Sequence, residues 1–241
     1  MIGMGTIVNT AAIVIGGVCG GLFGRLLKER HRDALCKLCG ISVLFIGIAG
    51  ALEGMLKVEG SAVSSSGAML LVISLALGGL VGELLDIEGL FERFGQWLKL
   101  KTGNAKDKQF VEGFVTASLT VCIGAMAIVG ALKDGLEGDS SVLVTKAVLD
   151  FIIILVMTGS LGKGCGFSAI PVAILQGSIT LLAGLVKPVM TEAALGNLST
   201  VGSVLIFCVG VNLVWGKTVR VANLLPAIVI AAAMAFLPFG I

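Results

Sequence analysis

Asp150 is the residue of this sequence best placed to do chemistry, because its carboxyl group stands inside a long apolar run. Leu149 and Phe151 flank it, and four aliphatic residues follow. An ionised side chain at bilayer depth costs roughly 2.5–3.5 kcal/mol on insertion scales, so it usually serves a purpose. A desolvated carboxylate can load and release a proton or hold a cation. We therefore predict a coupling site at Asp150. The alternative is a structural carboxylate, paired with Lys146 one helical turn earlier.

Neutral polar side chains within apolar runs are the candidates for a solute path. They are Asn9, Gln176, Asn212 and Asn223. Gln176 is the strongest of them, because it stands near the middle of its run. The competing interpretation is a hydrogen bond between helices, worth roughly 0.6 kcal/mol in a membrane protein.

Glycine and proline interrupt two of the apolar runs. Four glycines between 159 and 166 lead into Ser168 and Pro171, which we interpret as a helix cap and a first-turn proline. Asn223 and Pro226 repeat this pattern. The free N–H groups of such a helix start could face an anion or a polar solute, so Ser168, Pro171 and Asn223 join the candidates. The alternative is an ordinary helix start after a tight turn.

Motifs of the common enzyme classes are absent from the sequence. It contains neither a phosphate-binding loop nor a His-Glu-x-x-His motif, and its one histidine, His31, stands in a basic segment. Cys36 and Cys39 lack the second cysteine pair of a structural zinc site. We therefore predict no catalytic residue, no metal site and no cofactor.

The composition shows what kind of element must position these residues. Hydrophobic residues make up 56% of the 241 residues and charged residues 13%, against roughly 25% charged in soluble domains. Lipid must therefore be part of the solvent of this chain. The net charge of +2 offers no strongly basic face for nucleic acid.

Eight apolar stretches are each long enough to cross a bilayer as a helix. They cover residues 4–24, 38–56, 67–85, 110–132, 142–161, 166–186, 199–215 and 221–239. Their pattern lacks strand-like alternation, and lipid requires backbone groups to be paired within each segment. We predict one integral membrane domain over 1–241, an all-α polytopic bundle of about eight spans.

Basic residues set the predicted orientation. With eight spans, thirteen lysines and arginines fall on one side of the membrane and four on the other. Because basic residues favour the cytoplasmic side, both chain ends are predicted outside, in a bacterial inner membrane. The segment 87–108 lies on the basic side, and within it 87–100 has the spacing of an amphipathic helix at the membrane surface. A solvated loop is the alternative.

Internal similarity suggests an inverted repeat. Residues of the first two stretches recur 161 positions later, as in Gly5 with Gly166 and Ala12 with Ala173. The predicted halves, 1–86 and 166–239, would cross the membrane in opposite directions, with 110–161 supplying two linking spans. A run of glycines at four-residue spacing, Gly16, Gly20 and Gly24, indicates close helix packing, either within the chain or in a homo-oligomer.

Several runs of the sequence resemble a known bacterial membrane family. They are residues 5–9 (GTIVN), 77–88 (LGGLVGELLDIE), 112–119 (EGFVTASL), 124–130 (GAMAIVG), 167–171 (FSAIP) and 220–227 (RVANLLPA). The resemblance is to the family catalogued as domain of unknown function family 554, over nearly the whole chain. It implies an inner-membrane location and this architecture. It implies transport only as a label, without a substrate or catalytic residues.

Two functions are compatible with these sequence features. The leading hypothesis is a secondary transporter of a small solute, coupled to protons or cations at Asp150. The alternative is a non-transporting membrane scaffold or sensor, favoured by the glycine run and the 87–100 helix. The expected partners are the lipid bilayer and a small solute or ion.

Overall fold

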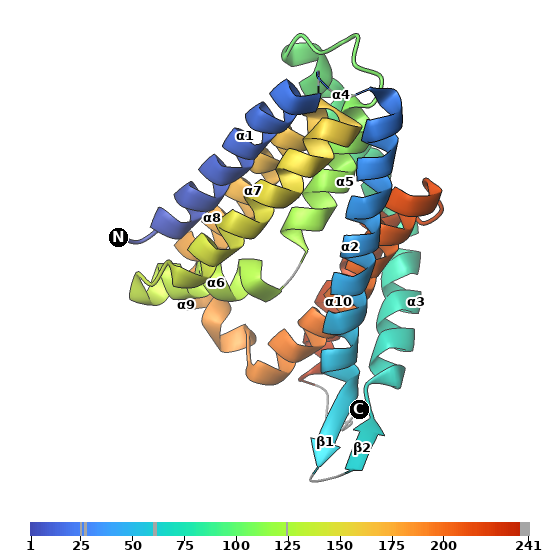
Figure 1. Ribbon diagram of the computed structural model, residues 1–241. Coiled ribbons are helices and arrows are strands. Elements are labelled where there is room, and N and C mark those ends of the chain that lie inside the picture. Colours follow the sequence, from blue (N-terminus) through green and yellow to red (C-terminus); the bar gives the residue numbers. More distant parts are fainter. Residues whose placement is uncertain (25, 27, 60–61, 124, 237–241) are drawn as a thin grey trace.

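The computed structural model is a bundle of helices with one small hairpin (Figure 1). It describes residues 1–24, 26, 28–59, 62–123 and 125–236. Arg25, Gly124 and the end of the predicted last span, 237–239, lie outside the described residues. The elements are α1 Met4–Gly24, α2 Glu29–Met55, β1 Leu56–Glu59, β2 Ala62–Ser65, α3 Ala68–Leu85, α4 Ile87–Lys101, α5 Phe110–Cys122, α6 Ala125–Glu137, α7 Ser141–Leu161, η1 Lys163–Ser168, α8 Ala169–Leu181, α9 Ala183–Val186, η2 Lys187–Val189, α10 Glu192–Trp215, η3 Val221–Leu224 and α11 Leu225–Met234.

The predicted all-α membrane bundle is confirmed. In the described part of the chain, six helices are long and apolar enough to cross a membrane, or seven if one bent pair counts as a span. That pair is α5 and α6, which meet at 61°. The stretch predicted as a span over 110–132 is therefore broken into two helices. The predicted eighth span corresponds to η3 and α11, a shorter apolar helix, Val221–Met234.

Glycines bring three early helices into backbone contact with later ones. On α1, a side chain at Gly16 would meet the carbonyl of Phe151 on α7 at 2.7 Å. On α2, Gly47 packs in the same way against Phe207 of α10, and on α3 Gly78 packs against Ala227 of α11. The α1 glycines thus form a packing seam within the chain, which is the first of the two roles expected for them.

The helices form two groups, which are joined by α5 and by a direct contact between α2 and α7. Helix α1 packs on α7, η1 and α8, while α2 packs on α10, and α10 and α3 pack on α11. Helix α5 contacts both α7 and α10 and so lies between the groups (Figure 1). The outward faces of the long helices are apolar, with Val18, Phe45 and Val72 each more than half exposed. Lipid is the solvent that such faces require.

The two ends of the bundle differ in structure. At one end β1 and β2 form an antiparallel hairpin, an element that the sequence patterns did not predict. At the other end lies α4, the helix expected from the amphipathic spacing of 87–100 (Figure 1). Helix α4 packs on α5, where Gly95 and Leu98 are buried and the ring of Phe94 lies 5.7 Å from that of Phe114.

Candidate functional site

A buried ion pair lies on α7, inside the group that α1, α7 and α8 form. The ammonium of Lys146 lies 2.7 and 2.6 Å from the two carboxylate oxygens of Asp150, one turn further along the helix. The side chains are 9% and 5% exposed. A buried pair keeps both charges only if its remaining hydrogen-bonding groups are satisfied, so the neighbours of this pair decide what it can do.

Lys146 also reaches the point where α5 ends. Its Nζ atom donates to the carbonyl of Val121, at 2.9 Å. The last carbonyls of a helix lack intrahelical partners and carry the negative end of the helix dipole, so they attract a cation. The bend between α5 and α6 thus creates a binding position that a straight helix would not offer.

Asn9 and Gln176 complete the cluster from α1 and α8. The Asn9 amide donates to Gln176 Oε1 at 3.2 Å, and the Asn9 side chain also interacts with Asp150. One turn away on each helix, the hydroxyls of Thr6 and Thr180 lie 3.4 Å apart. The structure therefore brings together Asp150, Asn9 and Gln176, three residues that the sequence singled out separately.

Two atoms of this cluster are buried without a hydrogen-bond partner. They are Asn9 Oδ1, an acceptor, and Gln176 Nε2, a donor. Buried polar atoms are nearly always paired, so an unpaired acceptor and an unpaired donor on two hydrogen-bonded residues suit a bound polar molecule. The carboxylate offers oxygen ligands to a proton or hard cation once Lys146 moves away.

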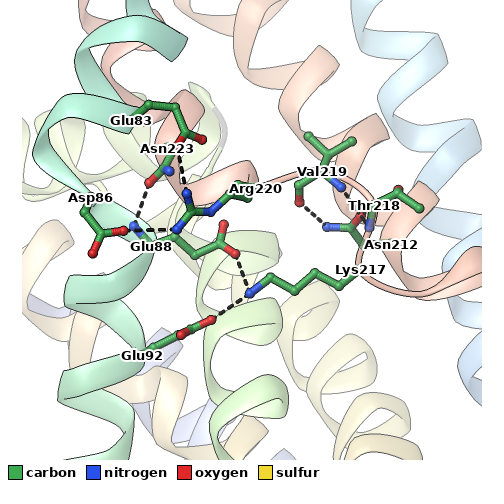
Figure 2. A network of polar contacts seen from close by, with 10 residues as sticks. All are labelled: Glu83, Asp86, Glu88, Glu92, Asn212, Lys217, Thr218, Val219, Arg220 and Asn223. Carbon is green, nitrogen blue, oxygen red and sulfur yellow. Dashed lines mark hydrogen bonds and ion pairs between the residues drawn. The ribbon is translucent and has the colours of Figure 1, made fainter.

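A second polar network joins α4 to the connection between α10 and α11 (Figure 2). Lys217 lies 2.6 Å from both Glu88 and Glu92. Arg220 pairs with Glu83 at 2.7 Å and with Asp86 at 3.1 Å. This network ties the α3–α4 corner to the last part of the chain.

The charges in this network shift the pKa of Lys217. Partial burial lowers that pKa, but the hydrogen bonds and negative charges of Glu88 and Glu92 outweigh the effect, so the pKa of Lys217 lies above its usual value. Glu88 is 3% exposed. Lys217 is therefore the counter-charge that permits Glu88 to be buried.

Asn212 and Asn223 accept hydrogen bonds from the backbone, while Asn223 Nδ2 is buried without a hydrogen-bond partner. Asn212 folds the turn after α10, because its Oδ1 accepts from the backbone of Thr218 and Val219 (Figure 2). Asn223 accepts from the backbone N–H of Glu88 at 2.8 Å, at the start of α4.

The predicted cap at the start of α8 is wrong. Ser168 donates to the carbonyl of Cys165 at 2.7 Å and makes no side-chain cap. The helix instead continues backwards into η1, which supplies the turn before it. Pro171 does stand in the first turn of α8, as expected.

A cavity of about 580 Å³ opens between α2, α5 and α10. Lys217, Glu88 and Asn212 are among its polar lining residues, and Leu119 of α5 is among its apolar ones. Leu119 is two residues from Val121, whose carbonyl binds Lys146. The cavity therefore extends along α5 as far as Leu119, and neither Lys146 nor Asp150 lines it.

Comparison with known proteins identifies the family. The family model described as "Protein of unknown function (DUF554)" matches residues 4–236. This chain belongs to that family. It is 29% identical to the uncharacterized membrane protein YdfK of Bacillus subtilis, over 96% of this chain and 95% of the relative. It is also 29% identical to the uncharacterized protein YqgA of Escherichia coli, over 95% and 94%. No solved structure matches the chain.

Two buried acidic residues were not singled out as site residues from the sequence. Asp134, at the end of an apolar run, is fully buried and accepts from the backbone N–H groups of Gly3 and Gly5. Glu88 falls on the polar face of the amphipathic spacing of 87–100 and is nevertheless buried. Neither position carries a local signal, because the partners are 129 residues or more away along the chain. Within the described residues, no group of three or more histidine, cysteine or acidic side chains is arranged to hold a metal ion.

Proposed function

We propose that this chain is a secondary transporter of a small polar solute across the bacterial inner membrane, driven by protons or cations that bind at Asp150. The observation that carries the proposal is the Lys146–Asp150 pair at the bend between α5 and α6. Ionisable groups inside a membrane are expensive, and they mark ion and proton pathways in transporters. Interrupted helices at mid-membrane, where free backbone groups meet the cargo, recur in such proteins.

The geometry suggests how ion binding and solute binding are coupled. A proton or cation at Asp150 neutralises the carboxylate and removes the partner of Lys146. The ammonium retains the Val121 carbonyl and turns toward α5, which changes the contact between α7 and the bend. Asn9 contacts Asp150 and holds Gln176, so the same event alters the unpaired donor and acceptor offered to the solute. The cavity beside Leu119 is the route from one side of the membrane.

An inverted repeat provides the movement for alternating access. A twofold axis in the membrane plane makes each helix antiparallel to its counterpart. The proposed counterparts pack in this manner: α1 meets α8 through Asn9 with Gln176, and α2 meets α10 through Gly47 with Phe207. The offset of 161 residues maps Gly47 onto Cys208, next to Phe207, so the axis would pass through that contact.

The basic residues give the proposed orientation. They gather at the end of the bundle that carries α4, which we assign to the cytoplasm, and both chain ends then lie outside. In this orientation the 580 Å³ cavity opens to the cytoplasm.

Charge movement in proteoliposomes tests the proposal. Transient currents are recorded on a solid-supported membrane under pH and sodium gradients, with a panel of amino acids, organic acids, sugars and amines. We expect a current that depends on one solute class, with empty liposomes as the control. If neither currents nor gradient-driven solute uptake, which also detects electroneutral exchange, exceed those of empty liposomes, the scaffold or sensor function replaces the transporter.

A further inference from the structure

A second cavity, of about 820 Å³, lies at the end of the bundle where α1, α2 and α7 meet the segment before α5. Three lysines line it: Lys106, Lys108 and Lys163. The acidic residues that face it are Asp33, which is paired with Lys37 at 3.1 Å, and Asp107, which accepts from the backbone N–H of Gln109. One of the two carboxylates thus already has a cationic partner, and the lysines leave the cavity positive.

An apolar groove of about 490 Å³ adjoins this cavity on the outside of the bundle. It runs between α1 and the η1–α8 segment, and Val14, Val18 and Phe167 are among its walls. Val14 and Val18 are 47% and 59% exposed, so the groove faces lipid. Glycines deepen it, since Gly17 and Gly166 touch through their backbones.

The cavity and the groove form one amphipathic site. Gly21 and Lys163 line both of them. Thr158, on the cavity side of this junction, is 2% exposed, and its hydroxyl has no hydrogen-bond partner. A Cβ atom at Gly21 would have only Thr158 Cγ2 within reach, at 4.0 Å, so the space beside Gly21 is open.

We propose that this site binds an anionic phospholipid, with its phosphate among the three lysines and one acyl chain in the groove. Lysine clusters at the cytoplasmic edge of membrane helices recognise anionic headgroups, at about 1 kcal/mol for each lysine. The Thr158 hydroxyl donates to a headgroup oxygen. A soluble anion would use the lysines but leave the groove empty, whereas a lipid fills both. The site lies apart from Asp150 and does not depend on the proposed transport.

Native mass spectrometry of the detergent-purified full chain tests this inference. Dioleoyl phosphatidylglycerol, phosphatidylethanolamine and phosphatidylcholine are titrated separately. We expect phosphatidylglycerol to bind most tightly, and Lys163→Gln and Lys106→Gln to weaken it about fivefold each. Lys101→Gln removes a lysine of α4 outside the cavity and should leave binding unchanged. Gly21→Leu should block chain entry, while Gly177→Leu, on α8 where a Cβ meets open space, should not.

Three results would overturn the inference. Equal retention of phosphatidylglycerol and phosphatidylcholine would reduce the site to ordinary lipid contact. Tighter binding of phosphatidylethanolamine would remove the anionic preference. Phosphatidylglycerol binding that needs the lysines but is unaffected by Gly21→Leu would mean a headgroup site without the groove. Elution volumes matching the wild type establish that the variants are folded.

Discussion

Lys146 donates to Asp150 at 2.6 Å and lies one turn before it on α7, so the two charges form a pair within a single helix. The same ammonium donates to the carbonyl of Val121 where α5 ends. A proton or cation that binds Asp150 must therefore compete with Lys146. The contact between α7 and the bend in the bundle then depends on the state of one carboxylate.

Removal of Lys146 alone should destabilise the folded protein. Lys146→Met leaves the Asp150 carboxylate buried without its counter-charge, which typically costs about 3–5 kcal/mol. We expect a marked fall in the thermal midpoint of the detergent-solubilised protein, measured by fluorescence-detected size exclusion. Lys133→Met, on the exposed face of α6, is the matched control and should change the midpoint little.

A double variant distinguishes the loss of the ion pair from the burial of an unpaired carboxylate. Lys146→Met with Asp150→Leu replaces the ion pair by apolar groups, and such replacements are often neutral or stabilising. We expect the double variant to recover most of the stability that Lys146→Met loses. If the single and double variants are equally unstable, the pair is not the source of the loss.

Asp134 should hold the start of α1. Asp134→Ala removes the acceptor of the Gly3 and Gly5 N–H groups, a loss of about 1–2 kcal/mol for an N-terminal cap. Hydrogen exchange of residues 3–9 should accelerate, whereas Glu137→Ala, exposed on the same helix, should leave it unchanged. Unchanged exchange in Asp134→Ala would contradict this role.

Two neighbouring glycines of α3, Gly79 and Gly82, should differ sharply in how much stability the protein loses when each is replaced by alanine. A methyl group at Gly82 would overlap the backbone carbonyl of Asn223, so Gly82→Ala must displace η3 and should cost about 1–3 kcal/mol or more. At Gly79 the methyl group meets only the end of the Leu224 side chain, at 3.3 Å. Gly79→Ala should therefore be tolerated, in part because alanine favours the helix by about 1 kcal/mol. Thermal midpoints of equal size for the two variants would be inconsistent with this packing.

The Lys217 network should lose strength at alkaline pH. Because the folded-state pKa of Lys217 is raised, its contribution is fully present below the unfolded value of about 10.4 and is lost as the pH rises through the folded value. The stability difference between the wild type and Lys217→Met should thus be constant from neutral pH to about pH 9 and shrink above about pH 10.4. Denaturation midpoints of the wild type and Lys217→Met, measured across this pH range, test this dependence, and Lys99→Met is the control. A stability difference between the wild type and Lys217→Met that grows as the pH rises would contradict this prediction.

Local patterns in the sequence account for most of the helices and for part of the site. Hydropathy located the spans because lipid leaves few alternatives to a helix, and the i, i+4 spacing already made Lys146 the natural partner of Asp150. The turn before Pro171 could also be predicted locally, because glycine and proline residues mark it in the sequence.

The remaining features depend on partners distant in the sequence. The bend after Cys122 was not predicted from the sequence, because glycines within an apolar run are common to straight and broken helices. Serine is a common residue type at helix N-caps, but Ser168 is the last residue of η1, which leads directly into α8. The hydrogen bond between Asn9 and Gln176 can be predicted only if α1 is known to pack against α8. In the sequence, the weak internal similarity was the one indication of that packing.

The most direct test of the central claim compares the solute-dependent current of the wild type with that of Asp150→Asn in matched proteoliposomes. Asp139→Asn makes the same chemical change just before α7 and serves as the control. We predict that Asp150→Asn abolishes the pH- or sodium-driven current and that Asp139→Asn retains it. A folded Asp150→Asn protein whose current keeps its size and its dependence on the gradient would contradict the assignment of Asp150 as the coupling site.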